Sequence, residues 1–166
     1  MKLSSDNGMD DESQSSQPQH PPPKYSALQG LYTGTCQRMR GVVQDTTVLL
    51  GLKSEKLEVE ADRYGENDLE ALDRFMVHRV VRDGLKSIEV SFGQAEQGGK
   101  PTNNEELFKA GSKHLLKLMR GLALCVAHGR QLQDLEIFGF ELQKQDIDLI
   151  ASGLNSNSTL KRFTLR

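Results

Sequence analysis

The sequence predicts an α/β fold in which strand-helix units stack side by side, and three observations carry this prediction. The first is an apolar triplet that recurs 28 residues later, with Leu132, Leu135 and Ile137 returning as Leu160, Phe163 and Leu165. The second is the tripeptide Leu57-Glu58-Val59, which returns 31 residues later as Ile88-Glu89-Val90. The third is a helical stripe between the two triplets, formed by Ile147, Ile150, Ala151 and Leu154.

The spacing L-x-x-L-x-L followed by a helix is that of a leucine-rich repeat. A strand of such a unit buries alternate residues and its helix buries one stripe, so neither element covers its apolar side alone. We therefore expect a solenoid with a parallel sheet on the concave side and helices on the convex side. Arrays of this kind offer a curved surface to a partner, which favours binding over catalysis.

The N-terminal region divides into a tail and a cap. Residues 1–23 are rich in Ser, Pro, Gln and acidic residues without aromatic or β-branched ones, which predicts a disordered tail. Residues 24–53 are expected to form a cap that shields the first repeat from water. The cap contains a predicted short buried strand at Val48-Leu49-Leu50 and, before it, a predicted helix with the apolar positions Tyr25, Leu28, Tyr32, Cys36 and Met39.

The repeats are expected to occupy residues 54–166. The first unit, residues 54–84, combines the strand at Leu57 with one helix that Asn67 and Glu70 would cap and that runs through Phe75 to Val80. From Ile88 to Leu135 the spacing is 47 residues, which predicts an inserted loop at residues 93–104.

A long helix is expected to follow the loop. Thr102 and Glu105 match a capping box, and the apolar face of the helix continues to about Ala127. The sequence ends at Leu165-Arg166, inside a predicted strand, so we expect a repeat array that is truncated at its C-terminus.

Composition bounds the function further. The formal net charge of -2 gives no overall electrostatic case for nucleic acid. No apolar run reaches the roughly 20 residues that span a bilayer, and residues 1–12 lack the apolar segment of a secretory signal, so we expect a cytoplasmic protein without membrane insertion. Cys36 and Cys125 fall in apolar helical patterns, which predicts buried thiols instead of a disulfide.

No motif for catalysis, a metal or a cofactor is present. The chain lacks a Gly-rich phosphate loop, a C-x-x-C pair and an H-E-x-x-H motif. His78, His114 and His128 stand at helical positions without a paired cysteine or nucleophile. We therefore expect a protein that is not an enzyme and takes no cofactor.

The predicted strands place one charged residue of each on the open side of the sheet. These residues are Glu58, Glu89 and Glu136, and strands about 4.8 Å apart would hold three like charges side by side. We interpret them as an acidic stripe for a basic partner, with Phe138 as an aromatic anchor beside it. Two alternatives remain: the glutamates are merely solvated, with Lys56 and Lys86 reducing their repulsion, and Phe138 is covered by another repeat or a loop.

A second candidate patch consists of basic residues. Lys109, Lys113, Lys117 and Arg120 would share one face of the long helix and contact an acidic protein or a nucleic acid. The alternative is a solvated outer face, because no aromatic residues alternate with these charges to stack on bases.

Two resemblances narrow the prediction. Residues 132–166 resemble repeats of the ribonuclease-inhibitor type, although Phe140 replaces the asparagine expected at the turn, so its hydrogen bonds would differ. From the Tyr25-Ser-Ala-Leu-Gln29 opening through the cap, irregular first repeat and insertion, the chain resembles the N-terminal part of the family of the centrosomal protein of 78 kDa. The matching segments include Leu132-Gln-Asp-Leu-Glu-Ile-Phe-Gly-Phe-Glu-Leu142 and Asp146-Ile-Asp-Leu-Ile-Ala-Ser-Gly-Leu154.

That resemblance implies a non-enzymatic scaffold at the centrosome or ciliary basal body. It implies a role in cilium assembly through protein contacts, including contacts with ubiquitin-ligase components. The further repeats and the C-terminal coiled coil of that family have no counterpart in these 166 residues. The alternative function is a leucine-rich-repeat regulator of an enzyme, of the GTPase-activating or inhibitor type.

Overall fold

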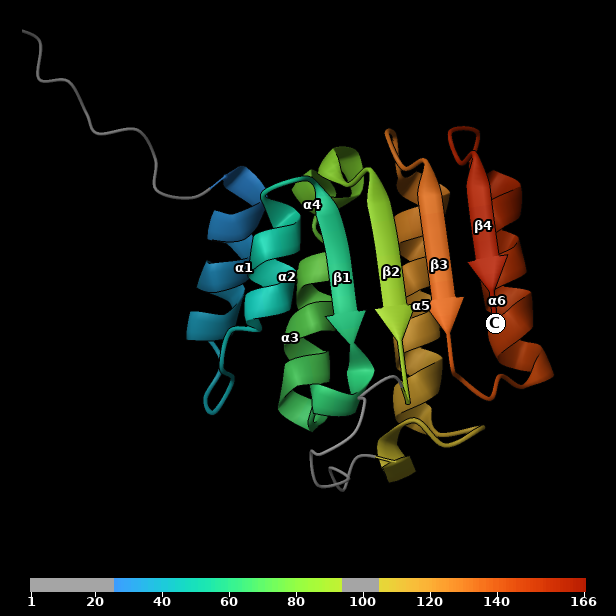
Figure 1. The fold of residues 1–166 in the computed structure, drawn as a ribbon, viewed down its shortest axis with the longest axis horizontal. Coiled ribbons are helices and arrows are strands. Elements are labelled where there is room, and N and C mark those ends of the chain that lie inside the picture. The colour runs from blue at the N-terminus through green and yellow to red at the C-terminus, as the bar shows by residue number, and fades with distance from the viewer. Residues whose placement is uncertain (1–25, 94–104) are drawn as a thin grey trace, which may run out of the picture.

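The described residues form two layers, a parallel sheet and a set of helices behind it (Figure 1). A computed structural model describes residues 26–93 and 105–166. The sheet has four strands in the order β1-β2-β3-β4, namely Lys56–Glu60, Ser87–Ser91, Asp134–Phe138 and Arg162–Leu165. This confirms an α/β fold with a parallel sheet. The predicted tail, the predicted loop beyond Gly93 and the Thr102 cap lie outside the described residues.

The register of the strands is the one expected from the sequence. Leu57 aligns with Ile88, Ile88 with Leu135, and Leu135 with Phe163. One position further along each strand, Glu58 aligns with Glu89 and Glu89 with Glu136. Strand residues alternate between the two faces of a sheet, so the three glutamates share one face.

Backbone hydrogen bonds connect the turns that precede the strands. The amide of Lys86 donates to the carbonyl of Glu55 at 2.9 Å, and the amide of Gln133 donates to that of Lys86 at 2.8 Å. The amide of Lys161 continues the series with a 2.8 Å bond to the carbonyl of Gln133. Each unit therefore stacks on the preceding one through equivalent atoms.

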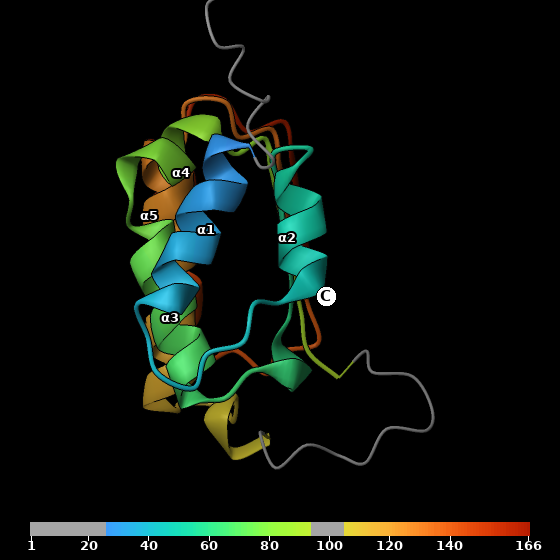
Figure 2. The same ribbon diagram turned by 90° about the vertical axis from the view of Figure 1, so that its left-hand side faces the viewer.

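Two helices form the N-terminal region. α1 (Ala27–Gln37) packs in the helix layer, where Tyr32 meets Phe75 edge to face at 5.4 Å. α2 (Thr46–Leu52) runs beside β1 in the layer of the sheet (Figure 2). The prediction of a strand at Val48-Leu49-Leu50 was wrong, because the side chain of Asp45 accepts from the amide of Thr47 at 2.9 Å and caps a helix there.

The helical part of the first unit is divided in two. A short 3-10 helix, η1 (Ala61–Arg63), follows β1, and α3 (Glu66–Met76) and α4 (Arg79–Gly84) follow it. The expected cap at Asn67 and Glu70 was wrong, since the carboxylate of Asp68 accepts from the amide of Gly65 at 2.8 Å. The single helix expected through Val80 ends at Met76, because His78 caps the separate helix α4 through the amide of Val80.

The helices of the later units also differ from expectation in their limits. After the 3-10 helix η2 (Glu105–Leu107), α5 spans Lys113–His128, and the hydroxyl of Ser112 caps it by accepting from the amide of Leu115 at 3.0 Å. α6 (Lys144–Ser156) buries Asp146, Ile150 and Gly153, whereas Ile147 and Ala151 are exposed. The buried face of α6 therefore differs from the expected stripe. It is turned so that Gly153 lies against α5, where a Cβ on this residue would be 2.7 Å from the carbonyl oxygen of Ala123.

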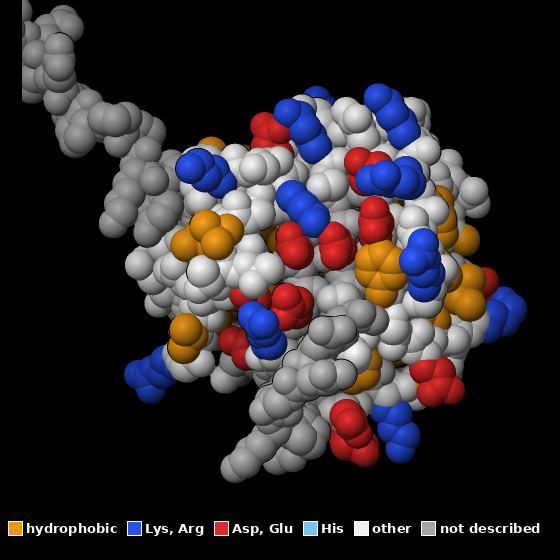
Figure 3. All heavy atoms as spheres, in the orientation of Figure 1, with side chains coloured by type: hydrophobic (Ala, Val, Ile, Leu, Met, Phe, Trp, Pro, Cys, Tyr) orange, Lys and Arg blue, Asp and Glu red, His pale blue; other side chains and the backbone are white. Residues whose placement is uncertain are grey.

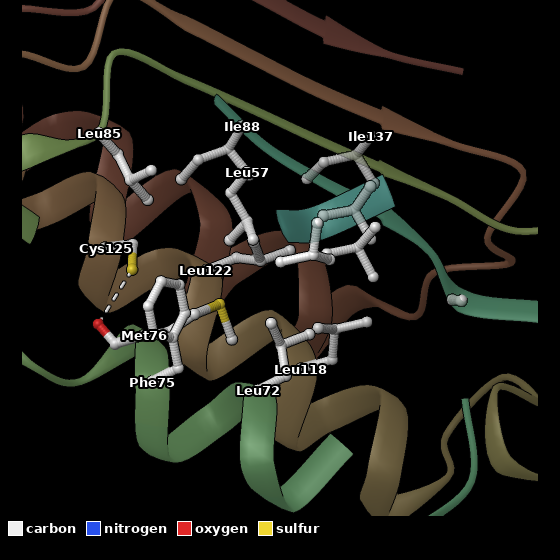
Figure 4. Packing of buried hydrophobic residues seen from close by; sticks show 14 of the residues in the cluster. Leu57, Leu72, Phe75, Met76, Leu85, Ile88, Leu118, Leu122, Cys125 and Ile137 are labelled. Carbon is white, nitrogen blue, oxygen red and sulfur yellow. Dashed lines mark hydrogen bonds between the residues drawn. The ribbon is translucent and has the colours of Figure 1, made fainter. Parts of the chain in front are cut away.

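The core lies between the sheet and the helices. Figure 4 shows Leu57, Ile88 and Ile137 pointing from the strands toward Phe75 and Leu122 of the helices. Both cysteines are buried and free, as expected, and the thiol of Cys125 donates to the carbonyl of Met76 at 3.2 Å. Burial raises the pKa of Cys125 to about 12, so its thiol stays protonated at neutral pH.

The β4 edge departs from the burial expected of a repeat. Phe163 and Leu165 are 40% and 43% exposed, whereas the equivalent Leu135 and Ile137 are fully buried. Among the described residues no further helix packs beyond α6 to cover them.

Candidate functional site

One face of the sheet is open over the described residues. Figure 2 shows α1, α3, α4 and α5 together on the opposite side, with α2 along the edge of β1. Figure 3 views the open face, where acidic side chains gather over the middle of the strands with basic ones beside them. We call this surface the open face and define it by the outward strand positions Lys56, Glu58, Glu60, Ser87, Glu89, Ser91, Asp134, Glu136, Phe138, Arg162 and Thr164, of which Ser91 alone is buried.

The predicted glutamate row lies across the centre of this face. The side chains of Glu58, Glu89 and Glu136 are 36%, 33% and 26% exposed, so each has part of its carboxylate stem packed among neighbours. They occupy aligned positions on three adjacent strands. The structure therefore brings together the three residues that the sequence selected.

Lys56 lies between two members of the row. Its ammonium is 3.1 Å from the carboxylate of Glu58 and 2.6 Å from that of Glu89. Burial of Lys56 opposes its charge, but the hydrogen bonds that its ammonium donates to the two carboxylates outweigh this effect and raise its pKa. Lys86, the other expected counter-charge, pairs with Glu55 instead.

Arg162 of β4 and Arg166, which follows that strand, supply the remaining counter-charges. Arg162 contacts the carboxylates of Asp134 at 3.0 Å and Glu136 at 3.5 Å. The guanidinium of Arg166 lies over the ring of Phe138, 5.9 Å from its centroid. Phe138 is half-buried, and in the described part of the chain it is Arg166, not another repeat, that lies over it.

The open face keeps an excess of negative charge. The carboxylates at its strand positions are Glu58, Glu60, Glu89, Asp134 and Glu136, and the cations on or beside it are Lys56, Arg63, Arg162 and Arg166. Five carboxylates against four cations leave an excess of one negative charge. The face therefore favours a cationic ligand, although less strongly than three unpaired glutamates would.

The second predicted patch is not one helix face. Lys109 precedes α5, and only Lys113, Lys117 and Arg120 lie on that helix. These three line a groove of about 540 Å³ whose other wall carries the acidic residues of α3, Glu66, Glu70 and Asp73.

The groove between α3 and α5 is neutralised from within. Lys117 pairs with Glu70 and lies 3.8 Å from the carboxylate of Asp73. The hydrogen bond from Lys117 lowers the pKa of Glu70, whereas burial raises that of Asp73. These ion pairs reduce the basic charge that Lys117 could offer to a nucleic acid or an acidic partner, and the second patch stays a prediction.

Sequence reasoning missed the arginines, whereas Lys56 had been expected near the glutamates. Lys56, Ser87, Asp134 and Arg162 form one aligned row beside the glutamates. The 28-residue repeat already placed Arg162 beside Asp134, so the signal was available in the register. Arg166, two positions beyond Thr164, could have been placed in the same way.

Other kinds of site find no support in the described residues. Within residues 26–93 and 105–166, no group of His, Cys, Asp and Glu is arranged to hold a metal ion. In the same ranges no helix is both long and apolar enough to cross a membrane. Comparison with protein-family models, with curated proteins and with solved structures found no match.

Proposed function

We propose that this chain is a non-enzymatic protein-protein interaction scaffold of the leucine-rich-repeat type. The observation that carries the proposal is the open face, an uncovered parallel sheet surface with a central row of carboxylates and an aromatic ring beside it. A sheet with helices on one side only leaves its second face available to a partner. The excess negative charge favours a partner with a basic surface.

The repeat assignment within this proposal is supported by the contacts between successive units. The strands follow one another across the sheet in chain order, one from each unit. The side-chain amide of Asn157 donates to the carbonyls of Val126 and Gly129 in the preceding unit, at 2.7 and 3.2 Å. Such nearest-neighbour contacts are typical of solenoids.

The cellular setting is proposed from the family resemblance alone. It points to the cytoplasm, to the centrosome or ciliary basal body, and to a scaffold role in cilium assembly. The partners would then include centrosomal proteins or components of a ubiquitin ligase. These proposals stand apart from the open face, and each can fail without the other.

The proposal is tested by reversing charge on the open face. Endogenously tagged chain in ciliated cells is compared with Glu89→Lys/Glu136→Lys and with the matched control Glu105→Lys/Glu141→Lys, whose residues are exposed and lie outside the sheet. The partners recovered with wild type and the control should be lost from the open-face variant. Recovery of the same partners by all three proteins would contradict the open face as the binding surface.

The same cells test the proposed location at the centrosome or ciliary basal body. Wild-type signal that coincides with a basal-body marker supports the ciliary proposal, and diffuse signal counts against it. The folded state of each variant is checked by its thermal unfolding midpoint, which exposed substitutions should leave nearly unchanged.

A further inference from the structure

We propose that the open face binds an α-helix which lies across the strands and presents Lys or Arg at positions i, i+3 and i+7. This inference rests on the proposed function, because it names the partner of the same surface. It follows from the spacing of Glu58, Glu89 and Glu136 and from the small residues beside them.

The spacing selects a helix over an extended peptide. Adjacent strands lie about 4.8 Å apart, so the outer two glutamates of the row are about 9.6 Å apart along a line across the sheet. Along a helix, i to i+3 advances about 4.5 Å and i to i+7 about 10.5 Å, and these residues share one face. In an extended peptide, residues on one side recur every 6.6 to 6.8 Å or so, which falls out of step with the row at its third glutamate.

The chain itself shows which groups this surface accepts. Arg162 reaches Asp134 and Glu136 at 3.0 and 3.5 Å, and Arg166 lies over Phe138. Both arrangements are those that a partner's guanidinium would adopt on a carboxylate and on an aromatic ring. A cationic side chain from a second protein would extend a pattern that the sheet already uses.

Acceptor capacity remains at the centre of the row. Glu58 and Glu89 share the single ammonium of Lys56. Each carboxylate has two oxygens and about four lone-pair sites, so one lysine does not saturate the pair. On β2 the outward neighbours of Glu89 are the half-buried Ser87 and the buried Ser91, and both side chains are too short to cover its carboxylate.

The face also orients the helix about its own axis. On one side of the glutamates lies the row of Glu60, Ser91 and Phe138, and on the other lies the row of Lys56, Ser87, Asp134 and Arg162. A basic stripe over the glutamates would therefore have an apolar residue over Phe138 on one flank and acidic or neutral residues over Lys56 and Arg162 on the other. The expected ligand is a basic amphipathic helix.

The test uses three synthetic peptides and the isotope-labelled chain. The first peptide presents arginines at i, i+3 and i+7 with one leucine on the flank, the second has the same composition with its arginines spread around the helix, and the third is the first with a central proline. Binding is followed by the amide chemical shifts of the labelled chain. The affinity is then measured with unlabelled chain at several salt concentrations, because the salt dependence reports the electrostatic contribution to binding.

The first peptide should shift the amides of β1, β2 and β3 and bind at least about tenfold more tightly than the second. Glu89→Gln and Glu136→Gln should each weaken its binding up to about fivefold, in the range of a partly exposed ion pair. Glu141→Gln, which removes an exposed charge outside the sheet, is the matched control and should leave the affinity unchanged. Because shift mapping is done on the wild-type chain, the result does not depend on how the variants fold.

Equal affinity for the first two peptides would show that binding depends only on the net charge of the peptide, and this would overturn the helix proposal. Tighter binding of the proline peptide would overturn it in favour of an extended ligand. If no peptide binds while partner capture still depends on Glu89 and Glu136, the proposal of a helical ligand is wrong and the proposed function stands. Partner capture that is indifferent to those charges would remove the proposed function itself.

Discussion

Asp45 is the residue through which the N-terminal region is fixed to the first unit. Its carboxylate accepts from the hydroxyl of Tyr64 at 2.9 Å and from the amide of Thr47 at 2.9 Å. Its own amide donates to the hydroxyl of Tyr32 at 3.1 Å. One residue therefore caps α2 and connects α1 with the residue that follows η1, through its carboxylate and its backbone amide.

The buried phenols of this network predict a loss of stability at alkaline pH. Burial raises the pKa of Tyr64 and of Tyr32 far above the value of about 10 that applies in the unfolded chain. The folded state therefore holds these protons longer, and its stability is full below pH 10 or so and falls above it, by about 1.4 kcal/mol per pH unit for each phenol. Urea unfolding at several pH values measures this slope.

Replacing Tyr64 isolates its share of that slope. Tyr64→Phe should cost about 1 to 2 kcal/mol at pH 7, because the carboxylate of Asp45 loses a donor. Its stability should then fall less steeply than that of wild type above about pH 10, so the two curves converge near pH 11. Parallel curves would mean that Tyr64 does not titrate differently in the folded and unfolded states.

Gly139 provides a second test at the scale of one residue. Its φ of 76° lies in the left-handed region, and a Cβ there would come within 1.9 Å of the carbonyl oxygen of Phe92. Gly139→Ala should therefore cost at least about 3 kcal/mol in the free energy of unfolding. Gly30→Ala is the control, since nothing lies within 4 Å of its Cβ and a helical alanine should stabilise α1 by up to about 1 kcal/mol.

At the scale of elements, the strands were predictable because alternation and repeat length both constrained them. Leu57, Ile88 and Leu135 align as expected, and the glutamates one position later follow from that register. Alternation and repeat length do not assign a secondary structure to a short apolar run, since Val48-Leu49-Leu50 fits a strand as well as a helix. The cap at Asp45 was the signal that could have identified α2.

Helix limits and charge partners depended on contacts that periodicity does not contain. Gly111-Ser112 interrupts the expected long helix, and the hydroxyl of Ser112 caps α5 there. Lys117 looked free on its own helix, yet α3 supplies Glu70 against it. The candidate glutamate row could thus be found from the sequence, whereas the pairing of each charge required the packed structure.

The turn before β4 stabilises the contact between two units through Asn157. Its amide nitrogen donates to Val126 and Gly129, and its oxygen accepts from the amides of Thr159 and Leu160 at 2.8 and 2.6 Å. Asn157→Ala should destabilise the fold by about 2 to 4 kcal/mol, because it removes all four of these hydrogen bonds and leaves the amides of Thr159 and Leu160 without this acceptor, although the carbonyls of Val126 and Gly129 keep the amide of Gly129 and the hydroxyl of Thr159 as donors. Chemical denaturation measures this loss.

Asn155→Ala is the matched control, since Asn155 is exposed near the end of α6. We expect it to change stability by less than about 0.5 kcal/mol. Equal effects of the two substitutions would show that the hydrogen bonds of Asn157 contribute little to the stacking of the units.

At the scale of the whole molecule, stability should be unequal along the sheet. β2 and β3 each have a strand on both sides, whereas β4 has one neighbouring strand and leaves Phe163 and Leu165 largely exposed. In arrays whose units contact only their neighbours, local opening costs least at an end. The open face should therefore be most rigid where Glu89 and Glu136 lie.

Hydrogen exchange tests this gradient directly on the native chain. Amides of β2 and β3 should exchange slowest, and those of β4 at least about tenfold faster, because opening β4 breaks fewer contacts. A ligand on the glutamate row should slow exchange in β1 to β3 more than in β4. Uniform protection across the strands would instead mean that the sheet opens only as one cooperative unit, and the rigidity of the open face would then belong to the whole fold.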